Sequence, residues 1–462
     1  MEQTNRLGTL GVGKLLLKLS VPAVTAQLVN MLYNIVDRIY IGNMEGIGDA
    51  ALTGVGVTFP VLMFISAFAS LIGMGGAPRA SVKLGEKNNA EAERIMGNCM
   101  AALLVLAVIL TAAFLALGEP LLYLFGASDE TIGYALTYMN IYVCGNIFVL
   151  PALGMNPFIS AQGFARTGML TVLIGAVVNI VLDPIFIYVF HWGVAGAAIA
   201  TVISQAVSAV WALAFLSGKK TTLRLKKCHI RLNFKVLWPV LALGVSPFVM
   251  NATESLISIC FNSSLQKYGG DDAVGAMTIL VSIMQLLSLP LSGLAQGAQP
   301  ITSYNYGCGK MDRVKKSFYL LFIVSMIYSL IFWLINMLFP QLLVGLFCKD
   351  GSLKSLAAGA ARVYLAAGFV MGAQRACQQT FISLEQAGCS LFLAILRKII
   401  LLIPFIYILP ALFPDHEVYA VFAAEPVADV LAVSCTVAYF FATFNKRLKK
   451  REQLLKEGGV IN

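Results

Sequence analysis

Long apolar runs, each long enough to cross a bilayer, are the feature that most restricts how this chain can fold. Between charged or Gly/Pro-rich breaks there are twelve of them, at residues 15–41, 51–76, 95–117, 133–155, 167–190, 193–216, 236–262, 273–300, 317–340, 357–382, 391–413 and 417–444. A helix of about 20 apolar residues spans the hydrocarbon core. Because 58% of the 462 residues are hydrophobic and only 12% are charged, we predict an all-α polytopic membrane protein with twelve transmembrane helices.

The charged residues are distributed as a topology signal. If both termini lie in the cytoplasm, 25 of the 33 Lys and Arg residues fall in cytoplasmic segments and only four fall in the opposite loops. This is the positive-inside asymmetry of multi-pass membrane proteins. The net charge of +10 therefore predicts cytoplasmic termini, with the lipid bilayer rather than a nucleic acid as the partner.

Cysteine, histidine and motif usage argues against a cofactor or an enzyme. The nine cysteines are scattered without a CxxC pair, and the three histidines have no partner at ligand spacing. GxSxG, HExxH and Walker A motifs are absent from the sequence. Nothing in the sequence points to ATP, so if this membrane protein moves a substrate, the energy comes from an ion gradient or from the substrate's own gradient.

The chain divides into two similar halves. Pro22 and Pro247 are 225 residues apart, and the FIS sequence at 158–160 recurs at 381–383, after 223 residues. Markers at nearly one offset indicate a duplicated six-helix unit. Since six is even, both copies have the same orientation in the bilayer, and such repeats commonly place a substrate site between them and expose it to each side in turn.

The longest basic connection, SGKKTTLRLKKCHIRLNFK, separates these halves. We interpret it as a solvated cytoplasmic linker. The predicted domains are an N-lobe of helices 1 to 6 (1–216), the linker (217–235), a C-lobe of helices 7 to 12 (236–444) and a cytoplasmic tail (445–462).

Polar residues within the fifth and sixth runs indicate a cation site. Asn179 and Asp183 are four residues apart and share a helical face, and Ala197 lies one turn before Thr201. An ionised carboxylate facing lipid is costly, so Asp183 must face protein, water or a cation. A carboxylate, an amide oxygen and a hydroxyl are hard donors, suited to a proton or an alkali cation such as Na+.

Asp37, late in the first run, has two interpretations. It either pairs with the adjacent Arg38 near the membrane interface or lies beside Asn179, Asp183 and Thr201. In the second arrangement two carboxylates share one proton or one monovalent cation, because two close carboxylates cannot both ionise cheaply.

Three acids in the second half also have two interpretations each. Glu254 follows Pro247 by seven residues, and Glu425 and Asp429 share a face of the twelfth run. The first interpretation is functional: these acids belong to a second coupling site or attract a cationic substrate. The alternative is structural, with Glu254 hydrogen bonded inside the bundle and the other two paired with Arg375 or Arg397.

These features together resemble the multidrug and toxic compound extrusion (MATE) family. The resemblance rests on YNIVDRIYIG (33–42), MNPFISAQG (155–163) and the spacing of the polar residues in the fifth and sixth runs. The C-terminal RACQQTFISLEQAG (375–388) is most similar to the MepA-like bacterial branch. The resemblance implies a V-shaped pair of six-helix lobes that exports cationic, amphipathic drugs and dyes in exchange for Na+ or H+.

The resemblance also assigns residues by position. One set of N-lobe residues corresponds to the family's cation site, in which Ala197 contributes its carbonyl. A second set corresponds to the family's polar substrate cavity. The cation-site set is Asp37, Asn179, Asp183, Ala197 and Thr201, and the cavity set is Asn30 and Asn156. Glu254 resembles the seventh-span acid of some members, whereas the tenth-span Asp of the sodium-coupled members has no clear counterpart.

The sequence therefore predicts a monomeric multidrug antiporter in the bacterial plasma membrane, with small-molecule substrates, and leaves Na+ and H+ undecided. The alternative is a flippase for lipid-linked oligosaccharides with a similar architecture. A flippase of this kind needs positive charge for a pyrophosphate, and the candidates are Arg38, Arg375, Arg397 and Lys398.

Overall fold

The computed structural model describes residues 2–44, 46–348 and 351–457, and every regular element in these ranges is helical. The first half contains α1 (Glu2–Thr9), α2 (Val12–Gly42), α3 (Gly48–Gly85), α4 (Asn89–Leu124), α5 (Ile132–Cys144), α6 (Asn146–Ala161), α7 (Ala165–Pro184), a π-helical turn (Ile185–Val189) and α8 (Gly193–Ser217). A 3-10 turn (Lys227–His229) leads to the second half. This contains α9 (Phe234–Gly307), α10 (Met311–Leu338), α11 (Pro340–Val344), α12 (Gly351–Tyr364), a 3-10 turn (Gly368–Val370), α13 (Met371–Ser383), α14 (Ala387–Ile395), a π-helical turn (Leu396–Leu402), α15 (Ile403–Leu412) and α16 (Glu417–Glu457).

Nine described helices are long and apolar enough to span a membrane, and eleven spans result if two bent pairs each count as one. These pairs bend by 62° between α5 and α6 and by 51° between α12 and α13, so the fourth and tenth predicted runs are broken rather than continuous. At 74 residues, α9 would measure about 110 Å if straight. It contains both the seventh and the eighth predicted runs, and the chain reverses at Gly270 (φ 64°, ψ −157°).

The predicted loop between those two runs is therefore wrong in detail. Residues 263–272 are helical apart from the backbone of Gly270. A helix can continue beyond the hydrocarbon core because its backbone hydrogen bonds are internal and its polar side chains reach water. Only glycine takes this positive-φ conformation without strain.

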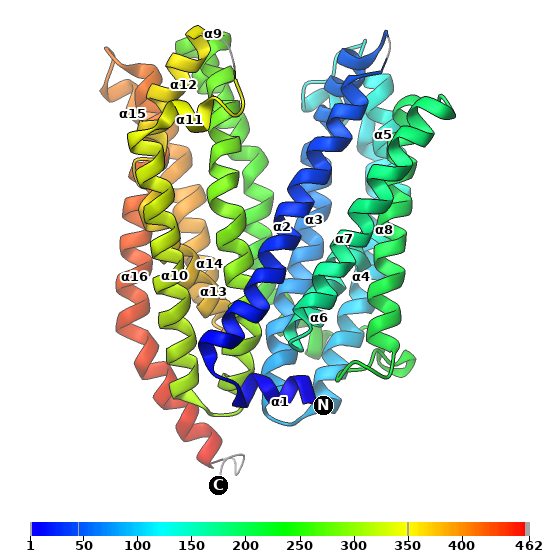
Figure 1. Ribbon diagram of the computed structural model, residues 1–462, viewed down its shortest axis with the longest axis vertical. Helices are drawn as coiled ribbons and strands as arrows, with labels where there is room; N and C mark the ends of the chain where they lie inside the picture. Colours follow the sequence, from blue (N-terminus) through cyan, green and yellow to red (C-terminus); the bar gives the residue numbers. More distant parts are fainter. Residues whose placement is uncertain (1, 45, 349–350, 458–462) are drawn as a thin grey trace.

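The helices form two groups that approach each other at one end of the molecule and diverge at the other (Figure 1). One group is α2–α8 and the other is α9–α16, while α1 and the end of α16 both lie at the end where the groups meet. We call this the terminal end. The buried apolar residues agree with this shape, because one core cluster crosses both groups near the terminal end and a second cluster lies within α9–α16 alone.

Glycines allow backbone contact between the two groups near the terminal end. A Cβ on Gly75 of α3 would lie 2.2 Å from the Val240 carbonyl oxygen of α9. On α9, a Cβ on Gly293 would lie 2.6 Å from Val24 Cα of α2. At these points the helices meet with no side chain between them.

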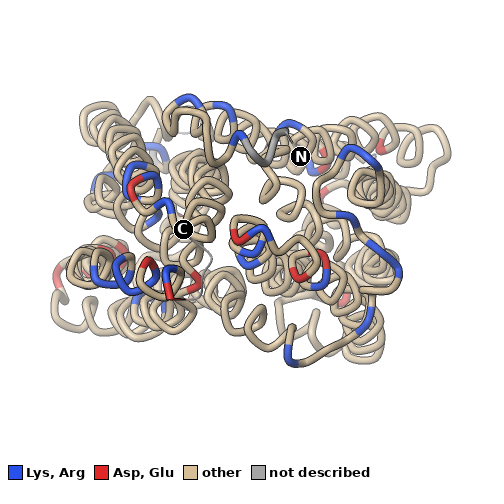
Figure 2. The backbone as a smooth tube through the Cα atoms, turned by 90° about the horizontal axis from the view of Figure 1, so that it is seen from below, with Lys and Arg blue, Asp and Glu red and all other residues tan. Residues whose placement is uncertain are grey.

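The short helix α1 lies across the terminal end and is held by the C-lobe. Arg313 donates to the carbonyls of Leu7 (3.0 Å) and Leu10 (2.6 Å), and Lys310 donates to the Gly8 carbonyl (2.9 Å). Arg79 of α3 and Glu385, before α14, form a further ion pair across the groups at 3.5 Å. Seen from this end, Lys and Arg lie on many of the connecting segments (Figure 2).

The connection between α8 and α9 packs on the N-lobe rather than extending freely into solvent. The Gln162 side-chain oxygen accepts from the Thr221 hydroxyl (2.8 Å) and from the backbone N–H groups of Thr222 (2.9 Å) and Leu223 (2.7 Å). Leu223 is fully buried. The last part of the predicted tail, 458–462, lies outside the described residues.

Candidate cation site

The buried polar residues of α7 and α8 form one hydrogen-bonded group. Asn179 and Asp183 share a face of α7, and each is at most 1% exposed. The Asn179 amide donates to Asp183 Oδ1 (3.0 Å) and to Thr201 Oγ1 (3.4 Å), and the Thr201 hydroxyl donates to the Ala197 carbonyl (3.0 Å). The four residues that the sequence spacing selects in these two helices therefore lie together.

Pro184 changes the helix directly after Asp183. Proline has no N–H to pair with the carbonyl one turn back, and α7 passes here into the π-helical turn. Single π-helical turns occur frequently at functional sites. Tyr188 of this turn donates to the Tyr40 carbonyl of α2 at 2.6 Å, which fixes the end of α2 beside the Asp183 segment.

Asp37 of α2 completes the group. Its carboxyl group lies close enough to that of Asp183 for the two to interact. Arg38, its alternative partner, lies over the Phe59 ring, with Cζ 5.3 Å from the ring centroid. The structure therefore brings together the two carboxyl groups, as in the second of the two arrangements considered from sequence.

Three oxygen atoms in this group are buried and receive no hydrogen bond within the described structure: Asp37 Oδ1, Asn179 Oδ1 and Asp183 Oδ2. Two adjacent carboxylates repel each other, and a membrane interior makes an unpaired charge costly. A proton or a monovalent cation held by these oxygens would remove both costs. A transition-metal site is not indicated, since no group of three or more His, Cys, Asp or Glu residues that could hold a metal occurs among the residues described.

Sequence reasoning missed two tyrosines beside the carboxyl groups. Tyr138 of α5 is 3% exposed, and its side chain lies close to Thr201. Tyr33 stands one turn before Asp37 on α2 and lies close to both carboxyl groups. Its spacing from Asp37 is a signal that the sequence contains, whereas the position of Tyr138 depends on how α5 packs against α8.

The acids of the C-lobe have partners within the protein. Arg397 lies 2.6 Å from Asp429 Oδ1 and 3.3 Å from Glu425 Oε1, and all three side chains are at most 7% exposed. Lys398 lies 3.0 Å from Glu254, whose side chain is 57% exposed. The arrangement with Arg397, one of the two considered from sequence, is the one that the structure contains.

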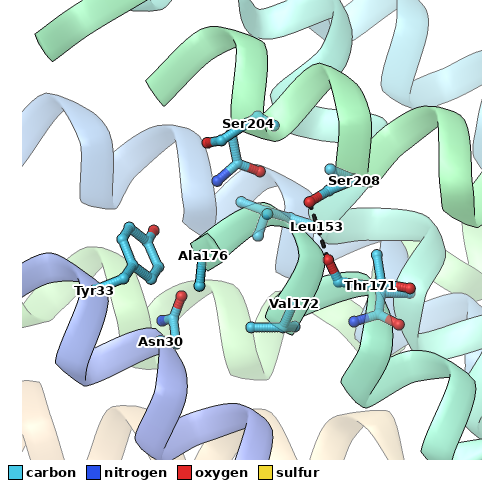
Figure 3. Close-up of a pocket in the computed structure, with 12 residues that line it drawn as sticks. Asn30, Tyr33, Leu153, Thr171, Val172, Ala176, Ser204 and Ser208 are labelled. Atoms are coloured by element: carbon cyan, nitrogen blue, oxygen red, sulfur yellow. Dashed lines mark hydrogen bonds between the residues drawn. The ribbon is translucent and has the colours of Figure 1, made fainter. Parts of the chain in front are cut away.

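The two predicted cavity residues line one small cavity in the N-lobe (Figure 3). Asn30 is exposed and Asn156 is half-buried. The Asn156 amide donates to the Gly168 carbonyl (3.3 Å), while its Oδ1 atom is buried without a donor among the described residues. The cavity has a volume of about 50 Å³, well below the roughly 300 Å³ at the lower end of drug-sized ligand pockets.

Comparison with known proteins shows which family this chain matches. A family model described as MatE matches residues 22–185 and 247–408, two stretches whose first residues are 225 positions apart. The chain is 24% identical to the multidrug export protein MepA of Staphylococcus haemolyticus (strain JCSC1435), over 91% of this chain and 92% of that protein.

Two solved structures have the same fold. The MATE multidrug transporter DinF-BH, solved in complex with R6G, is 37% identical, with a TM-score of 0.87 over 95% of this chain and 98% of that one. A MATE structure in the bent conformation is 24% identical, with a TM-score of 0.89 over 98% of this chain and 99% of that one. Because the family model matches more than half of its residues, the chain belongs to the MatE (MATE) family and is a membrane transporter.

Proposed function

We propose that this chain is a secondary active multidrug exporter of the bacterial plasma membrane, which exchanges cationic, amphipathic drugs or dyes for Na+ or H+. The observation that carries this proposal is the group of buried N-lobe oxygens that have no donor. The names of the relatives, multidrug export protein and multidrug transporter, support export of drugs by this chain as well. In this proposal the protein works as a monomer with both termini in the cytoplasm.

Binding of a small cation would change the repulsion between Asp37 and Asp183. When a proton or Na+ is bound, the two carboxyl groups can remain adjacent. When it leaves, two negative charges face each other in a low-dielectric site and favour separation of α2 from α7. Moving one charge through a membrane potential supplies about 2.3 kcal/mol per 100 mV, enough for more than a tenfold substrate gradient.

The helix α2 is placed to transmit this change to the lobes, which we propose move as units of residues 1–216 and 236–444. Its later half carries Asp37 against α7. Its earlier half packs on α9, where the Ser20 hydroxyl donates to the Leu294 carbonyl (3.3 Å). Pro22, inside α2, weakens the hydrogen-bond ladder between these two regions. Alternating access would then follow from movement of one helix that contacts both lobes.

We propose that coupling uses the N-lobe group alone. In the C-lobe, the Arg397 guanidinium already pairs with Glu425 and Asp429, and Lys398 pairs with Glu254. A mobile cation would have to displace a side chain that is tethered in place. These pairs also weaken the flippase alternative, because two of the four cationic residues that it requires are engaged with acids.

The test is transport of a cationic dye into proteoliposomes, with sodium and pH gradients imposed separately. Asp37→Asn and Asp183→Asn should each reduce gradient-driven transport at least tenfold without loss of folded protein. Asp49→Asn is the matched control, because Asp49 is an exposed N-lobe carboxylate in the first turn of α3.

Wild-type rates in both N-lobe variants would refute the coupling mechanism. If dye movement depends on neither gradient and the protein instead moves a lipid-linked oligosaccharide, the flippase alternative is correct.

A further inference from the structure

Arg375 is a cation of α13 that lies well inside the C-lobe. It stands eight residues before Ser383, the last residue of α13, so it is roughly 12 Å from that end of the helix. Its side chain is half-buried. A cation this far inside a membrane-spanning helix is costly, and such residues commonly have a function.

The face of α13 that carries Arg375 packs against the span that follows it. Met371 and Gln378 share this face, because they lie four residues before Arg375 and three residues after it. Arg397 Nη2 lies 3.6 Å from the Met371 sulfur, and the Gln378 amide donates to the Ser390 hydroxyl at 2.9 Å. Arg375 is therefore placed between two contacts that join α13 to α14 and to the π-helical turn after it.

The charged neighbours of Arg375 do not supply it with a counter-charge. Its guanidinium lies close enough to Arg397 and Glu254 to interact with both. However, Arg397 is a like charge that pairs with the two acids of α16, and Glu254 pairs with Lys398 at 3.0 Å. Within the described ranges Arg375 forms no ion pair and no hydrogen bond of its own. An unpaired cation beside a like charge is unfavourable in a membrane protein, and an anion from outside the chain would relieve it.

Glu254 shows how such an anion could reach Arg375. One turn earlier on α9, the Asn251 amide donates to the Ser70 hydroxyl of α3 at 3.1 Å, so the two lobes are in contact there. The Glu254 side chain, three residues later, is 57% exposed. Because this part of α9 runs away from the terminal end (Figure 1), Glu254 stands where the lobes begin to diverge. Arg375 is therefore close to a surface that solvent and solutes can enter.

The charge and the shape of Arg375 restrict the class of anion. One guanidinium supplies one positive charge, which a monoanion balances. A pyrophosphate, with two or more negative charges, would leave at least one of them uncompensated beside Glu254. The planar fork of arginine matches a carboxylate through two parallel hydrogen bonds. Met371 on α13, and Met250 on the Glu254 face of α9, are adaptable apolar side chains that suit an amphipathic molecule around this group.

We propose that Arg375 is an anion subsite in the C-lobe, which holds the carboxylate of zwitterionic amphiphiles. This inference rests on the proposed function and adds a class of substrate to the cationic drugs and dyes. Because Glu254 is already paired with Lys398, its repulsion of the incoming carboxylate is reduced. Substrates that carry only a positive charge do not use Arg375.

The experiment compares two dyes that differ in one group. Rhodamine 6G is a cationic ethyl ester, and rhodamine 19 is the corresponding free acid, a zwitterion at pH 7. Fluorescence anisotropy measures the affinity of each dye for the purified full-length protein. Arg375→Gln removes the guanidinium, whereas Arg375→Lys keeps the charge without the planar fork. Arg362→Gln is the matched control, because Arg362 is an exposed arginine of α12 in the same lobe.

We expect Arg375→Gln to weaken rhodamine 19 binding at least tenfold and Arg375→Lys at least threefold, with rhodamine 6G affinity within twofold of wild type in both. Arg362→Gln should leave both affinities unchanged. Two outcomes would overturn the subsite: rhodamine 19 affinity as in wild type in Arg375→Gln, or equal losses for the two dyes.

If Arg375→Gln does not fold, the ratio of the two affinities in Arg375→Lys decides, and a ratio equal to that of wild type would overturn the subsite. Failure of the proposed function has a different signature. In that case the wild-type protein would not transport rhodamine 6G under either a sodium or a pH gradient.

Discussion

Replacing Gly244 by alanine tests whether backbone contact between the lobes maintains their arrangement at the terminal end. A Cβ on Gly244 would lie 1.8 Å from the carbonyl oxygen of Leu71, 2.7 Å from its carbonyl carbon and 3.0 Å from its Cα. These are backbone atoms of α3, so no change of rotamer relieves the overlap and the helices must separate. Overpacking of this kind costs about 1–3 kcal/mol, which shifts a conformational equilibrium by about 5- to 150-fold.

The assay is a double electron–electron resonance measurement of the distance between the lobes. Spin labels at Asn89 of α4 and Asp312 of α10, both exposed, report the separation at the terminal end after the native cysteines have been replaced. Gly244→Ala should shift the population towards longer distances. Gly56→Ala is the matched control on α3, because a Cβ there meets no heavy atom within 4 Å. Identical distance distributions in Gly244→Ala, Gly56→Ala and the parent protein would refute the reasoning.

Two further predictions concern the fixed charges. Arg397→Met should lower stability by about 3–5 kcal/mol, because Glu425 and Asp429 then remain buried without their partner; thermal unfolding in detergent measures this, and adding Glu425→Gln and Asp429→Asn should recover most of the loss. Arg313→Met should speed hydrogen exchange of α1 amides about 10- to 100-fold, because a charged donor to backbone carbonyls contributes about 1.5–3 kcal/mol. Exposed Lys316→Met should leave α1 exchange unchanged, and equal exchange in both variants would contradict this role for Arg313.

The helices were predictable because the bilayer imposes a length and a composition on each of them. Their bends were not. The turn at Gly145 between α5 and α6, and the continuation of α9 past its predicted loop to Gly270, depend on packing and on helix ends outside the hydrocarbon core. Hydropathy does not report either of these.

In the candidate site, too, some features were predictable from the sequence and others depend on how the helices pack. The spacing of Asn179 and Asp183 predicts one helical face directly, because the period of the helix relates them. The approach of Asp37 and the contact of Tyr138 with Thr201 join residues far apart in sequence. Sequence alone left Asp37 with two partners, and family resemblance, rather than spacing, favoured the arrangement beside Asp183. The sequence had no signal for the attachment of the connection before α9 to Gln162, because a single glutamine side chain accepts all three of these hydrogen bonds.

The geometry of α2 lets it act as a lever that turns at Pro22. From Pro22 to Asp37 the helix rises by roughly 22 Å, so each degree of tilt at the proline displaces the carboxyl group by roughly 0.4 Å. Breaking a hydrogen-bond-length contact thus needs only a few degrees of rotation where α2 rests on α9. The relation also holds in reverse. A small rotation of α2 where it contacts α9 moves Asp37 by a larger distance and so changes the ion affinity at the Asp37 end of the helix directly.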